Sequence, residues 1–233
     1  MYFKWVLVMK SKPAQHLQFV LYGIICLIIF ASPKQMIQLQ FDFMNLDALE
    51  KSGQMMDTTV YWQLIEDSLK ETTEQEEQEE YLVNRLKVMN PQDIIGFHLR
   101  TGSLMVRSYL SELWCAAYIN NGGCSDDGFE YFRCWLISRG KEAFYTVLEK
   151  PDRLLDFAGE EFADYDYEFE SFGYVAVYAF ERKTGKSIYS HIEDRLRDAS
   201  EGYAPVNFNW EEDNPDSMKA ICPRLFAARM EVN

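Results

Sequence analysis

The sequence predicts an all-α protein, built as a single compact multi-helix domain with an irregular C-terminal tail. Apolar residues recur at helical spacing from about residue 57 onward, and typical helix-start and helix-stop residues separate these stretches. Hydrophobic residues make up 48% of the 233 residues and aromatic residues 15%, which excludes a disordered chain. We therefore expect an acidic helical domain over residues 57–228, preceded by an atypical N-terminal extension at residues 1–43.

The first expected helix begins near residue 58, where Asp57 or Thr58 can serve as its N-cap. Its apolar side contains Trp62, Ile65 and Leu69, which recur at the spacing of one helix face. This pattern predicts a helix with one side packed on a hydrophobic core.

Residues 71–80 include six glutamates. We interpret them as an exposed linker or as the exposed start of the next helix, and not as a cation site. The inward side chains of that helix are Leu82, Leu86 and Met89. Asn90-Pro91 then predicts the start of a further helix, because proline is favoured at the first helical position.

The clearest helical pattern lies between residues 110 and 121. Its apolar side chains follow one another at i, i+3, i+4, i+7 and i+8 and predict one buried stripe: Leu110, Leu113, Trp114, Ala117 and Tyr118. The sequence Asn120-Asn121-Gly122-Gly123 ends this helix, since glycine accepts the left-handed conformation common after a helix C-terminus.

Two more helices are expected before Pro151. The first repeats the same spacing as far as Gly140, with Phe129, Phe132, Arg133, Leu136 and Ile137. The second runs from Lys141 to Lys150 and stops at Pro151, because proline disfavours helical conformation in the residue before it.

The last part of the chain is less regular. Residues 171–182 can form a helix or a strand, and Thr184-Gly185 closes that element in either case. After Gly202 the helical pattern fades, and three prolines mark the irregular tail: Pro205, Pro215 and Pro223.

The charge distribution favours a basic protein as the partner. The formal net charge is −14; residues 1–43 contain four lysines and one aspartate, a net charge of +3, so the remaining residues carry −17. A domain this acidic repels both nucleic acid and anionic membranes. We therefore expect no nucleic-acid partner.

The cysteines indicate a reducing compartment. They are Cys26, Cys115, Cys124, Cys134 and Cys222, an odd number without any C-x-x-C pair. This pattern predicts neither a disulfide framework nor a zinc site.

Known nucleotide-binding and metal-binding motifs do not occur in the sequence, so we expect no cofactor and no metal.

The N-terminal extension contains an apolar run at residues 17–31 that follows Lys10 and Lys12. This run is short for a spanning helix, which needs about 20 residues. Three interpretations stay open: an upstream extension from a mis-assigned start codon before Met44, a single membrane anchor, or a cleaved signal peptide. An anchor would place the acidic domain outside the cytoplasm.

The most distinctive feature is the corner between the two central helices. Ser125 can cap the second helix, and Asp126 and Asp127 suit the positive end of its dipole. A purely structural corner explains these residues. Alternatively, Ser125, Asp126, Asp127 and Glu130 form an interaction surface for a basic partner or a cation, together with acidic residues 160–170.

Two other side chains are weak catalytic candidates beside Asp126 and Asp127. Arg133 lies on a largely apolar helix, so it needs a partner; we expect a nearby carboxylate from Asp126, Asp127 or Glu130, with anion binding as the alternative. His98 lies in a strongly patterned helix, without the second histidine or glutamate of a zinc motif.

Three stretches of this sequence together resemble a known family. They are Tyr61–Ile65, Leu113–Ile119 and, most specifically, Gly122–Asp127 with the aromatic residues and Arg133 that follow. They are similar to the uncharacterised bacterial family called domain of unknown function 4240, over roughly residues 57–185. The resemblance implies a helical, cytosolic protein that starts near Met44. It supplies no catalytic residues.

The leading hypothesis is therefore an acidic helical interaction or regulatory module in the cytoplasm that binds another protein. An enzyme of unknown reaction that uses Asp126, Asp127, Arg133 and His98 is the first alternative. It requires these side chains to converge on a cleft. A membrane-anchored acidic domain is the second alternative and depends on residues 1–43.

Overall fold

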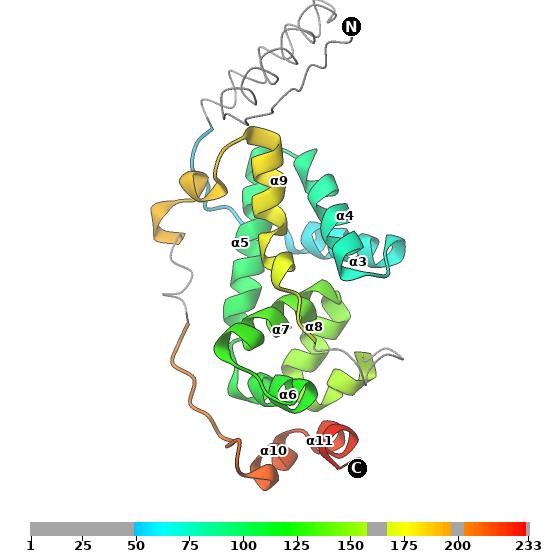
Figure 1. Ribbon diagram of the computed structural model, residues 1–233. Coiled ribbons are helices and arrows are strands. Elements are labelled where there is room, and N and C mark those ends of the chain that lie inside the picture. The colour runs from blue at the N-terminus through cyan, green and yellow to red at the C-terminus, as the bar shows by residue number, and fades with distance from the viewer. Residues whose placement is uncertain (1–48, 158–166, 197–202, 232–233) are drawn as a thin grey trace, which may run out of the picture. The chain divides into compact units, whose positions relative to one another are not determined.

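The computed structural model describes residues 49–157, 167–196 and 203–231 (Figure 1). Within these ranges the prediction of an all-α fold is confirmed: there is no strand, and Ser52 and Ile192 form an isolated bridge. The elements are α3 (Thr58–Glu71), α4 (Gln75–Lys87), α5 (Pro91–Arg107), α6 (Ser111–Asn121), α7 (Asp126–Ser138), α8 (Lys141–Glu149), η1 (Pro151–Phe157), η2 (Glu170–Tyr174), α9 (Val175–Thr184), η3 (Ile188–His191), η4 (Asp194–Leu196), α10 (Pro215–Ile221) and α11 (Pro223–Met230), where η marks a 3-10 helix.

Helix α3 begins where the sequence predicts. Asp57 is its N-cap, and its Oδ1 accepts hydrogen bonds from the amides of Thr59 at 2.8 Å and Val60 at 3.2 Å. Trp62 and Ile65 are buried, whereas Leu69 is only half-buried. Helix α4 begins at Gln75, so the glutamate-rich segment is partly a link and partly the exposed first turns of a helix.

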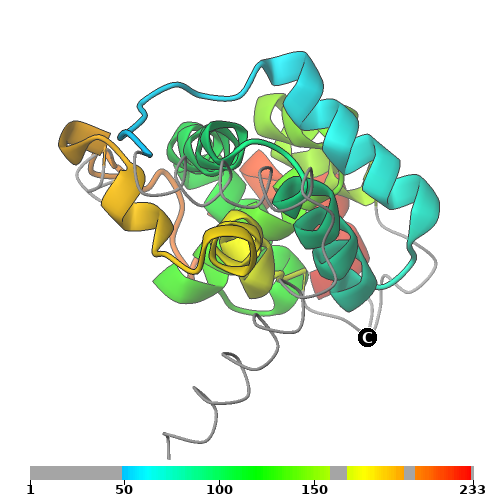
Figure 2. The same ribbon diagram turned by 90° about the horizontal axis from the view of Figure 1, so that it is seen from above.

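Helix α9 resolves the ambiguity over residues 171–182 in favour of a helix. It packs against both α4 and α5, and both views show it beside them (Figures 1 and 2). Its buried residues are Val175, Ala176, Ala179 and Phe180. Gly185 ends it with φ of 68°, in the left-handed region that glycine tolerates.

The predicted stripe on α6 is only partly right. Leu113 and Ala117 are buried, but Leu110 precedes the helix and is 39% exposed, and Trp114 and Tyr118 are half-buried. The reason is that α6 packs against α7, α10, α11 and η1, which cover it on more than one side. A helix with this many neighbours buries residues all round, here including Cys115, Ala116 and Ile119.

Helix α7 forms the centre of the core. All five residues predicted to face inward are buried, including Arg133. The helix contacts α5, α6, α8 and η2, so it is enclosed on several sides.

The tail contains more helix than the sequence suggested. Pro215 and Pro223 are the first residues of α10 and α11, because proline lacks only an amide that the first turn leaves unpaired in any case. Both helices pack on α6, and α11 also packs on η1. Residues 203–214 form the irregular part, which Trp210 anchors by donating from Nε1 to the carbonyl of Ser111 at 2.9 Å.

In the described part of the chain, every helix is too short or too polar to traverse a lipid bilayer. The apolar run at residues 17–31 and most of the acidic segment 160–170 lie outside the described residues.

Candidate interaction surface

The corner between α6 and α7 is a well-defined turn. Gly122 and Gly123 have φ of 69° and 144°, values that other residues rarely adopt. The indole Nε1 of Trp114 donates to the carbonyl of Cys124 at 3.0 Å, and the Trp114 ring stacks on Phe129 with centroids 4.5 Å apart. The loop is therefore held against both helices that it joins.

Ser125 is the N-cap of α7, as predicted. Its Oγ accepts a hydrogen bond from the amide of Gly128 at 3.1 Å. Asp126 and Asp127 occupy the first turn and are exposed, as is Glu130 one turn further on. The capping role is thus present, and the carboxylates stay available on the surface.

Arg133 does not pair with a carboxylate of the described residues, contrary to our expectation. It is 2% exposed, and its Nη1 donates to the carbonyl of Met105 at 2.7 Å and to the hydroxyl of Tyr203 at 3.2 Å. Its Nε donates to the carbonyl of Phe129 at 3.2 Å. The side chain leans inward, because the apolar face of α7 that carries it points to the core.

Aromatic rings surround the Arg133 guanidinium. Its central carbon lies 4.8 Å from the ring centre of Phe129, 5.0 Å from Tyr109 and 5.1 Å from Tyr203. Attraction between the cation and the ring faces offsets part of the cost of burying the charge. Arg133 therefore joins α5, α7 and the C-terminal segment, and its role here is structural.

His98 lies elsewhere in the fold. It is on α5, where its ring meets Tyr189 edge-on with centroids 5.7 Å apart. Burial lowers its pKa below the usual value, so the imidazole is neutral at pH 7. Among the described residues, no hydrogen bond or ring contact joins His98, Arg133 and the two aspartates.

Cys124 also lacks the character of a nucleophile. Burial, with a smaller contribution from the nearby carboxylate of Glu168, raises the pKa of its thiol to about 12. A thiol with this pKa is protonated at pH 7, and nucleophilic attack requires the thiolate. The described residues also contain no group of three or more His, Cys, Asp or Glu side chains placed to hold a metal ion.

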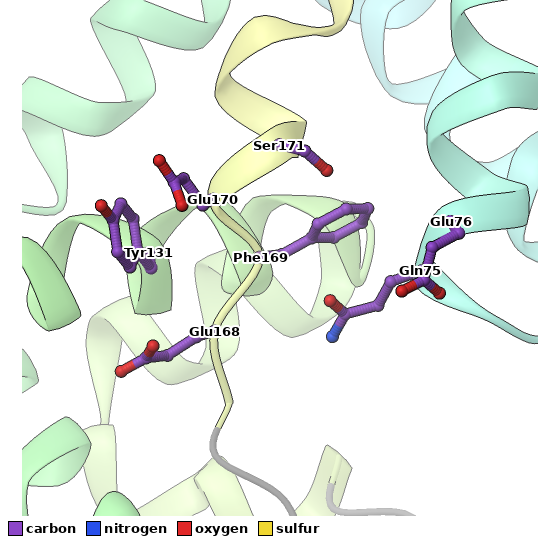
Figure 3. A pocket seen from close by; sticks show the side chains of 7 residues that line it. All are labelled: Gln75, Glu76, Tyr131, Glu168, Phe169, Glu170 and Ser171. Carbon is purple, nitrogen blue, oxygen red and sulfur yellow. The ribbon is translucent and has the colours of Figure 1, made fainter.

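A second acidic segment, residues 168–171, lies beside the helix that carries the carboxylates of the corner. Residues 168–171 run between α7 and α4 (Figure 3). The amide of Phe169 donates to the carbonyl of Tyr131 at 3.0 Å. On the other side, the hydroxyl of Ser171 donates to Glu79 on α4 at 2.6 Å. Phe169 is 3% exposed and anchors this segment, which leaves Glu170 at the surface beside Tyr131.

Burial and the nearby carboxylates raise the pKa of two tyrosines in this region. Partial burial, then the carboxylates of Glu170 and Asp127, raise the pKa of the Tyr131 phenol. The pKa of Tyr174 is raised by burial and by Glu170 and Glu130. We call the set Asp127, Glu130, Tyr131, Glu170 and Tyr174 the acidic tyrosine surface.

A cavity of about 300 Å³ adjoins this surface. Its lining contains three glutamates and no basic residue: Gln75, Glu76, Tyr131, Glu168, Phe169, Glu170 and Ser171 (Figure 3). Glu130, Asp127 and part of the acidic segment were predictable from the sequence, whereas Tyr131 and Tyr174 were not among the predicted residues. The only available signal was that tyrosine and acidic residues occur together in both stretches.

The comparisons with known proteins identify a family whose description names no activity. A family model described as "Protein of unknown function (DUF4240)" matches residues 56–182, from the start of α3 into α9, and confirms the resemblance expected from the sequence. No curated protein and no solved structure matches the chain.

Proposed function

Because the chain belongs to the DUF4240 family, to whose name no activity is attached, we propose from its geometry that it is a protein-interaction module. It binds a basic segment of another protein through the acidic tyrosine surface. The observation that carries this proposal is that acidic residues of α7 and η2 lie together around two tyrosines and form one exposed surface.

The charges of this face support a basic partner. Glu130 and Glu170 make no ion pair with a lysine or arginine of the described residues, so their negative charge is not neutralised within this part of the chain. Unpaired carboxylates on a protein with a net charge of −14 attract cations and increase the rate of encounter with them.

Binding and folding depend on different side chains of this region. The anchors of the surface are buried or capped groups such as Phe169 and Ser125, whereas Glu130 is exposed and Glu170 lies at the surface. Substitution of the two glutamates is therefore expected to leave the fold intact.

The test compares the partners of three forms of the full chain, each tagged at the C-terminus and purified from its native cell. The first is the wild type, the second is Glu130→Lys with Glu170→Lys, and the third is Glu71→Lys with Glu149→Lys. The third form is the matched control, because it changes the net charge equally at two exposed sites at helix C-terminal ends.

We expect a protein with a basic segment to co-purify with the wild type and the control and to be lost from the surface variant. Circular dichroism of all three forms checks that the fold is retained. If the surface variant keeps every partner of the wild type, or if the wild type has none, the proposal is wrong.

A further inference from the structure

We infer that the residue docking at the centre of the acidic tyrosine surface is an arginine of the partner, stacked on Tyr174 and paired with Glu170. This inference rests on the proposed function and specifies the chemistry of its partner.

The first observation is an exposed pair of aromatic rings. Tyr174 is 42% exposed and Tyr178 is 36% exposed, and their ring centroids are 6.1 Å apart. They are four residues apart, across the junction of η2 with α9, so they project from the same side. Neither phenol takes part in any hydrogen bond identified among the described residues. The two adjacent rings, tilted by 31° to each other, are partly exposed and can each offer a face for stacking.

The second observation is the position of carboxylates around these rings. Glu170 begins η2, is exposed and lies beside Tyr131 (Figure 3), and Tyr174 ends the same element four residues later. Burial, then the carboxylates of Glu170 and Glu130, raise the pKa of the Tyr174 phenol. A second cavity, of about 360 Å³, lies along the same helix and is lined by Glu79, Tyr178, Glu181 and Arg182. Arg182, which lines this cavity, already pairs with Glu80 at 2.8 Å. We therefore place the incoming cation at the other ring of the exposed pair, that of Tyr174.

A ring face beside a carboxylate favours arginine over lysine. The planar guanidinium can stack on the ring and donate two parallel hydrogen bonds to the carboxylate at the same time. The ammonium of lysine is a compact, strongly hydrated charge and gains less from stacking. Charge alone explains a basic partner, and the tyrosines add the preference for arginine.

Other contacts of the same chain illustrate this preference. Arginines lie over tyrosine, phenylalanine or tryptophan rings in five contacts of the described residues, made by Arg107, Arg133 and Arg139. Lys219 makes the corresponding lysine contact, at 6.0 Å from the ring of Phe226. The surface rings carry the same chemistry without an arginine of the described residues over them.

The experiment uses two short glycine-serine peptides of identical design, one with arginines and one with lysines in the same positions. Their affinities for the full chain are measured by titration, with the tyrosine signals in the NMR spectrum as the readout. We expect the arginine peptide to bind about threefold to tenfold more tightly, and the Tyr174 and Tyr178 signals to shift.

Three variants separate the contributions of the ring and the charge. Tyr174→Leu should abolish the preference for the arginine peptide, Tyr174→Phe should keep it, and Glu170→Gln should weaken both peptides. If Tyr174→Leu does not fold by circular dichroism, Tyr178→Leu replaces it.

The outcomes distinguish this inference from the proposed function. Equal affinities for the two peptides, both reduced by Glu130→Lys with Glu170→Lys, would overturn the arginine preference and retain the interaction module. Binding that is insensitive to that double variant would overturn both. An absence of binding by the arginine peptide would also overturn the inference.

Discussion

Neighbouring charged residues of this protein differ in role: some are buried and stabilise the fold, and others are exposed and can bind a partner. Arg133 and Glu130 are one turn apart on α7, yet Arg133 is enclosed by carbonyl oxygens and rings whereas Glu130 faces solvent. The sequence placed both near the same corner. It could not tell that Arg133 finds its partners on α5 and the C-terminal segment, because these contacts span 28 and 70 residues of chain.

Replacing Arg133 should destabilise the fold. In Arg133→Met the carbonyl of Met105 loses its charged donor inside the core and keeps only the Ser108 hydroxyl at 3.2 Å, and the loss of a hydrogen bond to a charged group costs about 1.5–3 kcal/mol. The free energy of unfolding in urea measures this loss. Arg85→Met is the control, since Arg85 is exposed, and we expect a change within about 0.5 kcal/mol. Equal stability of the two variants would contradict the structural role of Arg133.

His98 should make stability fall with acid. Burial lowers its pKa in the folded state, so the unfolded state binds the proton more readily. The contribution of the neutral histidine is complete above the unfolded pKa of about 6.5 and decreases as the pH falls below that value. Urea unfolding between about pH 7.5 and 5.5 should therefore show a smaller pH dependence in His98→Gln than in the wild type. Identical slopes would exclude this contribution.

At the scale of elements, local signals predicted helix starts better than helix neighbours. Asp57 and Ser125 are N-caps as expected, since a cap depends on residues close in sequence. The stripe on α6 was partly wrong because four other elements cover this helix, and no local pattern reveals them. Pro215 and Pro223 were expected to mark an irregular tail, although each begins a helix.

The corner between α6 and α7 should contribute to stability independently of binding. Ser125→Ala removes the hydrogen bond to the amide of Gly128 and should lower the free energy of unfolding by about 0.5–2 kcal/mol. Ser125→Asp, which can accept the same bond, should retain most of the stability. Neither variant should change the affinity for the arginine peptide; a loss of affinity in the folded alanine variant would make Ser125 part of the binding site.

At the scale of the whole molecule, the negative net charge was evident from the composition, but the positions of the acidic residues on the surface were not. No local pattern joins Glu130 with Tyr174, which are 44 residues apart, because η2 and α7 meet only in the folded chain. The acidic residues of the candidate surface were therefore predictable, namely Asp127 and Glu130 at the corner and Glu170 in the acidic segment 160–170. The contribution of Tyr131 and Tyr174 depends on tertiary packing.

Affinity for a basic peptide should decrease strongly with salt. Raising the ionic strength from about 0.01 M to about 1 M shortens the Debye length from about 30 Å to about 3 Å, which screens exposed charges. Titrations of the arginine peptide across this range should show a steady loss of affinity, and a neutral glycine-serine peptide should show no binding at any salt concentration. Salt-independent binding of the arginine peptide would indicate that the carboxylates do not drive association.

The packing of the last two helices has a practical consequence for where this protein can be cut. The family match ends at residue 182, but α10 and α11 lie on α6 and η1, where Arg224 pairs with Asp156 at 2.9 Å and Asp152 accepts from the amide of Leu225 at 2.9 Å. A fragment trimmed to the family boundary would expose the apolar side of α6 to water and would tend to aggregate. Any recombinant version meant to represent the domain should therefore extend through residue 231.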